Sequence, residues 1–320
     1  MPRSLTAASL VIFLAVAPCA PGQEYPHKPI RIVVGYTAGG GNDIIVRVLV
    51  PKLSEALGQP VIVDNRSGAQ SIIAAELVAK ATPDGYTLLM GPSGPMTMNP
   101  AIYSKLPYSP LRDFAPITMI GKFPLILVTS PSLPVKSVKE LVEYAKARPD
   151  KISYGASAAA FQLTTELFNQ KTGTRFLHIP YKGVNESVNA VIAGQVTITI
   201  GDPATIVGLM KAGRVKALAV TSAARHPAWP ELPTLAEAGV PDIEVILWTG
   251  FHAPARTPAA VVRKFRDEVV RVIGLPEIRE RLAAMAIDPS GNTPEEYRRI
   301  IAADIAKWTA VAKAANIKAD

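Results

Sequence analysis

The chain has 320 residues, and its 34 Lys and Arg residues outnumber 26 Asp and Glu residues to give a net charge of +8. The basic residues are scattered, without a run interleaved with aromatic side chains, and a single cysteine leaves no zinc-finger spacing. These features exclude a nucleic-acid-binding surface, whereas a diffuse positive field suits the attraction of small anions.

The first residues, MPRSLTAASLVIFLAVAPCAPGQ, are typical of a secretory signal peptide. Arg3 is followed by an apolar stretch and then by small residues, and we expect cleavage after Gly22. The only cysteine, Cys19, lies in this segment, and Pro18 before it disfavours a lipoprotein. Removing residues 1–22 lowers the charge to +7 and leaves roughly 298 residues, 320 minus 22, without a thiol. This fits a bacterial periplasm, and no second apolar run is long enough to span a membrane.

Apolar, strand-like runs alternate with helical stretches along the rest of the chain. We predict helices at residues 71–81, 138–147 and 258–273, and strands at residues 30–34, 61–63, 88–90, 125–129, 196–200, 217–220 and 245–247. This alternation predicts an α/β fold with largely parallel sheets.

The loop from Thr37 to Asn42, TAGGGN, connects the first predicted strand to a long helical pattern. It offers backbone N–H groups at a helix N-terminus with few side chains to cover them, a geometry that holds a phosphate or a carboxylate. A plain tight turn is the alternative. We expect Asn42 or Asp43 to cap the helix rather than to contact a ligand.

The opening unit occurs a second time. KISYGASAAAFQLTTELFNQKTGTRFLHIPYKG again reads as a strand, a loop of small residues from Ala156 to Ala160, a helix and a strand. Gly173 would end this helix as Gly58 ends the first. Two equivalent lobes follow, and their two loops would close on one small anion in a shared cleft.

The chain resembles the Bug family, the substrate-binding proteins of tripartite tricarboxylate transporters. The likeness is carried in order by YPHKPIRIVVGYTAGGGNDIIVR, LGQPVIVDNRSGA, ATPDGYTLL, NPAIYSKLPYSPLRDFAPIT, PSLPVKSVKELVEYAKARP, YKGVNESVNAVIAGQV, KAGRVKALAVTS, LPTLAEAGVPDIEV and TPEEYRRIIAADIAKW. The resemblance implies a type II periplasmic-binding-protein fold, with residues 23–124 and 250–320 in one lobe and 125–249 in the other. It also implies a ligand held by its carboxylate in the interlobe cleft.

Two loops depart from the family pattern. Where the family commonly has Gly-Ala-Gly-Gly, this chain has Gly68-Ala69-Gln70-Ser71, and GASAAAFQLTTELF replaces a Gly- and Ser/Thr-rich loop ending in His-Leu. Both loops are expected to line the cleft. The fold prediction is unaffected, and the identity of the ligand stays open.

We predict ligand contacts from both loops and from polar residues that follow strands in small-residue surroundings. Ser157, in the second loop, would donate a hydrogen bond to the ligand. The larger side chains Tyr36, Phe161 and Gln162 would either pack against the ligand or belong to the ordinary core. The full predicted set is Tyr36, Thr37, Ala38, Gly39, Gly40, Gln70, Ser93, Ser157, Ala158, Ala159, Phe161, Gln162 and Asp202.

No motif supports catalysis. The glycines fit neither a dinucleotide fingerprint nor a P-loop, and GPSGP is not a nucleophile elbow. The histidines His27, His178, His226 and His252 are far apart without metal-ligand spacing, so we expect no metal and no cofactor. We expect Lys182 to be solvated rather than part of the site.

These observations favour a monomeric, periplasmic receptor that binds a small organic carboxylate and delivers it to integral membrane transporter subunits. A sensor that signals its ligand state to a membrane partner would use the same site. An enzyme on the same scaffold would need an acid/base or metal set that the sequence does not show.

Overall fold

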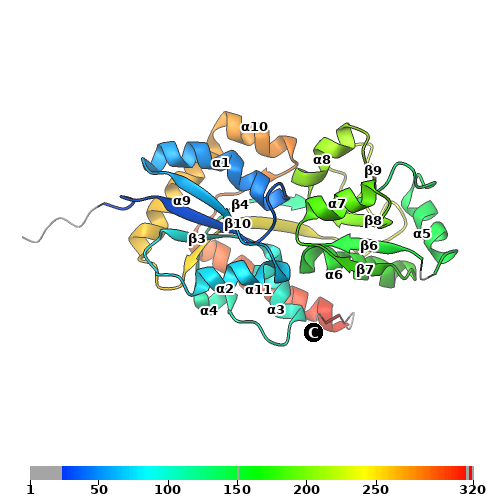
Figure 1. The fold of residues 1–320 in the computed structure, drawn as a ribbon, viewed down its shortest axis with the longest axis horizontal. Helices are drawn as coiled ribbons and strands as arrows, with labels where there is room; N and C mark the ends of the chain where they lie inside the picture. Colours follow the sequence, from blue (N-terminus) through cyan, green and yellow to red (C-terminus); the bar gives the residue numbers. More distant parts are fainter. Residues whose placement is uncertain (1–23, 150, 315–316, 319–320) are drawn as a thin grey trace, which may run out of the picture.

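The computed structural model describes residues 24–149, 151–314 and 317–318. The predicted signal peptide therefore lies outside the described residues. Two sheets lie side by side along the long axis, with the first and last parts of the chain in one half and the middle of the chain in the other (Figure 1).

The first sheet has six strands in the order β11-β4-β10-β3-β1-β2. β1 pairs in parallel with β2 and β3, whereas β10 is antiparallel to both β3 and β4. The strands are β1 (Ile30–Val34), β2 (Val61–Asn65), β3 (Thr87–Pro92), β4 (Phe114–Pro124), β10 (Ile246–Pro254) and β11 (Asp288–Pro289).

Helices cover both faces of this sheet, which explains why every residue of β1 except Arg31 is apolar. Ile32 and Val34 pack in the core shared with α1 and α9, while Val33 points to the core formed with α2 and α11. The helical segments of this half are α1 (Gly41–Leu57), η1 (Ala69–Ser71), α2 (Ile72–Ala79), η2 (Gly94–Met98), α3 (Asn99–Ile102), α4 (Pro110–Asp113), α9 (Ala259–Gly274), α10 (Pro276–Ala284) and α11 (Pro294–Ala314).

The second sheet has five strands in the order β7-β6-β8-β5-β9, with β6 parallel to β7 and β8 and with β5 antiparallel to β8 and β9. Its strands are β5 (Ile126–Thr129), β6 (Ser153–Ala156), β7 (Leu177–Pro180), β8 (Ile198–Gly201) and β9 (Lys216–Val220). Its helices are α5 (Val138–Lys146), α6 (Ala159–Thr172), α7 (Val184–Ile192) and α8 (Pro203–Lys211).

The chain passes between the sheets at two places that meet at Thr221. Leu125, between β4 and β5, donates its N–H to the Thr221 hydroxyl at 2.8 Å, and that hydroxyl donates to the carbonyl of Val245 at 2.6 Å, just before β10. The buried Thr221 side chain thus joins both crossing segments. The lobe limits at residues 125 and 249 stay a prediction, although the change of sheet falls at Leu125 and β10 begins at Ile246.

The repeated unit is confirmed as two strand–helix–strand units, β1-α1-β2 and β6-α6-β7, each with its two strands parallel. Gly58 and Gly173 end the two helices in the left-handed conformation, with φ of 63° and 68°. The second loop is shorter than predicted. Ala156 ends β6 and α6 begins at Ala159, because alanine favours extension of the helix over a loop.

Candidate ligand pocket between the lobes

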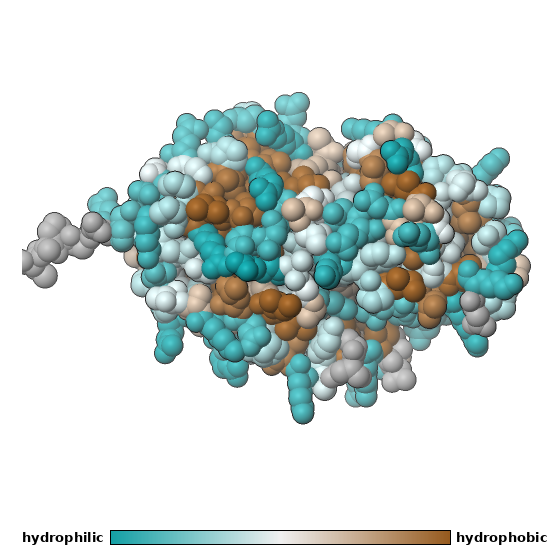
Figure 2. All heavy atoms as spheres, viewed as in Figure 1, coloured by the Kyte–Doolittle hydropathy of each residue, from teal (hydrophilic) through white to brown (hydrophobic). Residues whose placement is uncertain are grey.

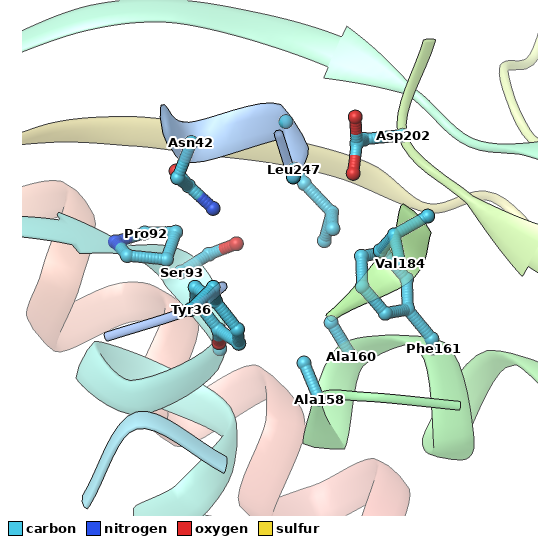
Figure 3. Close-up of a pocket in the computed structure, with 13 residues that line it drawn as sticks. Tyr36, Asn42, Pro92, Ser93, Ala158, Ala160, Phe161, Val184, Asp202 and Leu247 are labelled. Carbon is cyan, nitrogen blue, oxygen red and sulfur yellow. The ribbon is translucent and has the colours of Figure 1, made fainter. Parts of the chain in front are cut away.

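A pocket lies where the two halves meet, and it encloses about 420 Å³, part of it open to solvent. Figure 3 shows Asn42 and Ser93 on one side, with Ala158, Ala160, Phe161 and Val184 on the other. The full lining consists of Tyr36, Gly40, Gly41, Asn42, Pro92, Ser93, Gly94, Ala158, Ala160, Phe161, Val184, Asp202 and Leu247.

Helix N-termini from both halves converge on this pocket. Gly40, Ala158 and Gly183 are the N-terminal capping positions of α1, α6 and α7, and none of them makes a side-chain capping hydrogen bond. The first N–H groups of a helix have no intrahelical partner, and the helix dipole adds partial positive charge there. The pocket therefore favours an anion without any cationic side chain.

Two of the backbone amides that we predicted as ligand donors already donate hydrogen bonds within the first loop and its helix. The Gly40 N–H donates to the Thr37 carbonyl at 3.1 Å, and the Gly39 N–H donates to the Asp43 carboxylate at 2.9 Å. Gly39, rather than Gly40, has a positive φ, of 79°. The first-turn amides of Gly41 and Asn42 remain without an intrahelical partner, so the donors lie slightly further along the chain than predicted.

The prediction that Asn42 or Asp43 caps α1 is wrong, because the helix has no side-chain cap and Asp43 instead accepts the N–H of Gly39, one residue before the capping position. Burial opposes the charge of Asp43, but hydrogen bonds from Arg47, the Gly39 N–H and Asn65 outweigh it and hold the pKa below its usual value. Asn42 instead lines the pocket. Its Oδ1 accepts a hydrogen bond from the Thr249 hydroxyl at 2.8 Å, which leaves the Nδ2 group to face the cavity (Figure 3).

Two serine hydroxyls at the pocket are buried without a hydrogen-bond partner in the described chain. Ser93 lines the pocket and is 1% exposed, whereas Ser157, 3% exposed, is absent from the lining and directly precedes Ala158, the N-terminal capping position of α6. Leaving a buried hydroxyl unpaired costs free energy, so both are suited to bind a ligand atom. Ser93 was predicted in the site because it follows a strand, and Ser157 because it belongs to the second loop.

Thr37 and Ala38 contact the other lobe instead of lining the pocket. The Thr37 hydroxyl donates to Oδ1 of Asn185 at 2.9 Å, and Nδ2 of Asn185 donates to the Ala38 carbonyl at 3.2 Å. A Cβ built on Gly183 would lie 2.0 Å from the Thr37 hydroxyl, so only glycine permits this approach. The N-terminus of α7 thus binds the first loop through Asn185, and we call these two hydrogen bonds the interlobe clasp. No local sequence pattern indicated this contact.

Gln70 and Gln162 also meet across the two halves rather than in the pocket lining. Nε2 of Gln70 donates to Oε1 of Gln162 at 3.2 Å. Ala69, Gln70 and Ser71 have φ of 45°, 50° and 69°, a conformation that costs free energy in non-glycine residues. Gln70 and Ser71, which stand where the family pattern has glycines, thus have a backbone conformation that glycine adopts without strain. Ala159, the first residue of α6, is likewise absent from the lining.

Asp202 lines the pocket across the cavity from Asn42 and Ser93 (Figure 3), and it is 4% exposed. It caps α8, because its Oδ1 accepts both the N–H and the hydroxyl of Thr205 at 3.0 Å. Burial raises the pKa of the Asp202 carboxyl and also raises the pKa of the neighbouring Tyr36 phenol. Tyr36 is therefore a neutral wall of the pocket.

The pocket contains residues that the sequence analysis did not select. Gly41 and Asn42 belong to the predicted first loop, Pro92 and Gly94 flank Ser93, and Ala160 belongs to the predicted second loop, so each had a nearby signal. Val184 and Leu247 lie far along the chain from every predicted site residue, and no sequence signal indicated them. Six of the predicted residues line the pocket: Tyr36, Gly40, Ser93, Ala158, Phe161 and Asp202.

The described residues contain no group of three or more His, Cys, Asp and Glu side chains that could hold a metal ion. No helix in the described part of the chain is long and apolar enough to cross a membrane. Hydrophobic residues reach the visible surface in separate patches over both halves, among hydrophilic ones (Figure 2).

Residues 45–317 match the model of the tripartite tricarboxylate transporter family receptors. The chain belongs to this receptor family. It is 34% identical to protein BugT of Bordetella pertussis over 317 residues, 97% of each chain. Rpa4515 of R. palustris, solved with adipate, is 38% identical with a TM-score of 0.89, over 92% of this chain and 99% of that one.

MatC from Rhodopseudomonas palustris, solved with malate, is 28% identical with a TM-score of 0.86, over 90% of this chain and 99% of that one. The predicted Bug-family resemblance and the two-lobe periplasmic-binding-protein fold are thereby confirmed. The family consists of periplasmic solute receptors and not of enzymes, as the sequence analysis expected.

Proposed function

We propose that this receptor binds a small organic carboxylate in the pocket between its lobes and delivers it, as a monomer, to integral membrane transporter subunits. The observation that carries the proposal is the convergence of uncapped helix N-termini with the unpartnered hydroxyls of Ser93 and Ser157. Neutral donors of this kind stabilise a carboxylate and need no cofactor.

The relatives support the ligand class. Rpa4515 was solved with adipate and MatC with malate, and both have the same fold as this chain. Secretion to the periplasm with removal of residues 1–22 is part of the proposal, and N-terminal sequencing of the mature protein would test it.

A thermal-shift screen of small carboxylic acids and their amides tests the binding. An acid at about 100 times its Kd stabilises the folded chain by about 2.7 kcal/mol. For a chain of this length, we expect the melting midpoint to rise by about 5 °C. Amides should give no shift, because they carry no negative charge to interact with the helix N-termini. Equal shifts for acids and amides would contradict carboxylate recognition.

A variant of the first loop locates the site. Gly40 lines the pocket and has φ of −79°, which any residue adopts, so Gly40→Ile adds a branched side chain at the α1 N-terminus with one tight contact, 3.2 Å from its Cβ to the Thr37 carbonyl. The variant should melt cooperatively and lose the acid-induced shift. Delivery is tested separately, because cells that carry the membrane subunits should lose uptake of the bound acid when this chain is deleted.

A further inference from the structure

Asp202 is the only carboxylate among the described residues that line the pocket, and no Lys, Arg or His is among them. Its two oxygens have different surroundings. Oδ1 accepts two hydrogen bonds from Thr205, the carboxylate also accepts the backbone N–H of Asp202 itself, and no other described residue donates to Oδ2. An acceptor that is 4% exposed and incompletely paired thus belongs to a pocket otherwise supplied with donors.

The carboxylate lies directly against the proposed anion site. A Cβ built on Gly41 would lie 2.0 Å from Oδ1 and 2.6 Å from Oδ2 of Asp202, so the side chain packs on the first turn of α1. A ligand carboxylate at the same N-terminus would be its close neighbour. Two buried anions repel each other unless a proton donor lies between them.

The free donors of the lining, Nδ2 of Asn42 and the Ser93 hydroxyl, lie across the cavity from Asp202 (Figure 3), so the donor beside Asp202 must come from the ligand. We propose that Asp202 selects acids with a hydroxyl or ammonium group beside the carboxylate, which are 2-hydroxy and 2-amino acids. This inference rests on the proposed function, because it assumes that the carboxylate binds at α1. The carboxylate of the ligand then contacts the amides of Gly41 and Asn42, while the neighbouring group donates to Asp202.

Calorimetry with matched acids tests the inference on the wild-type chain. The probes are succinate, both enantiomers of malate and of aspartate, adipate and 2-aminoadipate. In at least one series, the substituted acid should bind 10-fold or more tightly than its unsubstituted parent. Equal or weaker binding of every substituted acid would overturn the role of Asp202 while leaving carboxylate binding intact.

Asp202→Asn is a conservative variant, because the amide oxygen still accepts the N–H of Thr205 and so keeps the α8 cap. It should reduce the preference for the ammonium group to 3-fold or less and should strengthen binding of the unsubstituted acid, since the repulsion is removed. Retention of the preference in this variant would refute the assignment. The wild-type comparison decides the question even where the variant does not fold.

Two further outcomes separate the alternatives. If the unsubstituted acids bind best and each takes up one proton on binding, Asp202 itself carries the proton and the inference is wrong. If none of the probes binds to the wild-type chain, this contradicts the proposed function and the inference together, whereas binding of unsubstituted acids alone contradicts only the inference.

Discussion

Gly41 at the start of α1 offers a test of whether the lobes must come into contact to bind the acid. A methyl group at this position would lie 2.0 Å from Oδ1 of Asp202, against about 3.4 Å for an ordinary contact. Gly41→Ala therefore places an atom about 1.4 Å too close to the other lobe. The new atom is harmless only when the lobes are apart.

The two consequences of Gly41→Ala have opposite signs. Replacing glycine by alanine in a helix stabilises it by up to about 1 kcal/mol. Overpacking in a closed interface costs about 1–3 kcal/mol. We therefore expect the Kd for the acid to rise about 5- to 150-fold, while the melting midpoint without acid stays the same or rises.

Isothermal titration calorimetry and thermal melts measure both effects on one preparation. Gly208→Ala is the matched control, because Gly208 lies in α8, is exposed, and its Cβ would meet nothing within 4 Å. This control should gain stability and bind the acid like wild type. If Gly41→Ala also binds like wild type, Asp202 does not lie against α1 in the bound receptor.

Two other substitutions test the interlobe clasp and the core. Asn185→Ala removes the hydrogen bonds to Thr37 and Ala38, and at about 1 kcal/mol each we expect the Kd to rise roughly 5- to 30-fold; an unchanged Kd in calorimetry would exclude a role for the clasp. Burial lowers the pKa of His252 to about 3. Unfolded histidine titrates near 6.5, so wild type should lose about 1.4 kcal/mol of unfolding free energy per pH unit as the pH falls below 6.5. His252→Phe should remove up to about 3 kcal/mol of this loss between pH 6.5 and 4 in urea titrations, whereas parallel pH profiles would show that another group titrates.

The sequence predicted those parts of the fold whose cause is local. Ile30–Val34 is a buried strand because Ile30, Ile32, Val33 and Val34 place apolar side chains on both faces. Gly58 and Gly173 end helices because glycine adopts positive φ without strain. Ser137 likewise caps α5, accepting the N–H of Glu140 at 3.1 Å. Such features need only neighbours along the chain.

The pocket could be predicted only in part, because its composition depends on contacts between distant residues. Nothing near Asn185 indicates that its amide clasps Thr37, 148 residues earlier. The same limit applies to Leu247, which reaches the pocket only because β10 returns from the second lobe into the first sheet. The reassignment of Asn42 from cap to pocket wall depends on Thr249, which takes its amide oxygen.

The lobes meet through small groups and neutral hydrogen bonds, and this favours reversible binding. Gly41 and Gly183 let backbone from one lobe approach side chains of the other, and Asn185 adds two neutral hydrogen bonds. Each such bond contributes about 1 kcal/mol, far less than breaking a buried ion pair would cost. Both crossing segments are joined at the buried Thr221, so opening requires bending at one point rather than melting of either sheet. The proposed release of an acid to a membrane partner would require this combination of a fixed donor set and weak hydrogen bonds between the lobes.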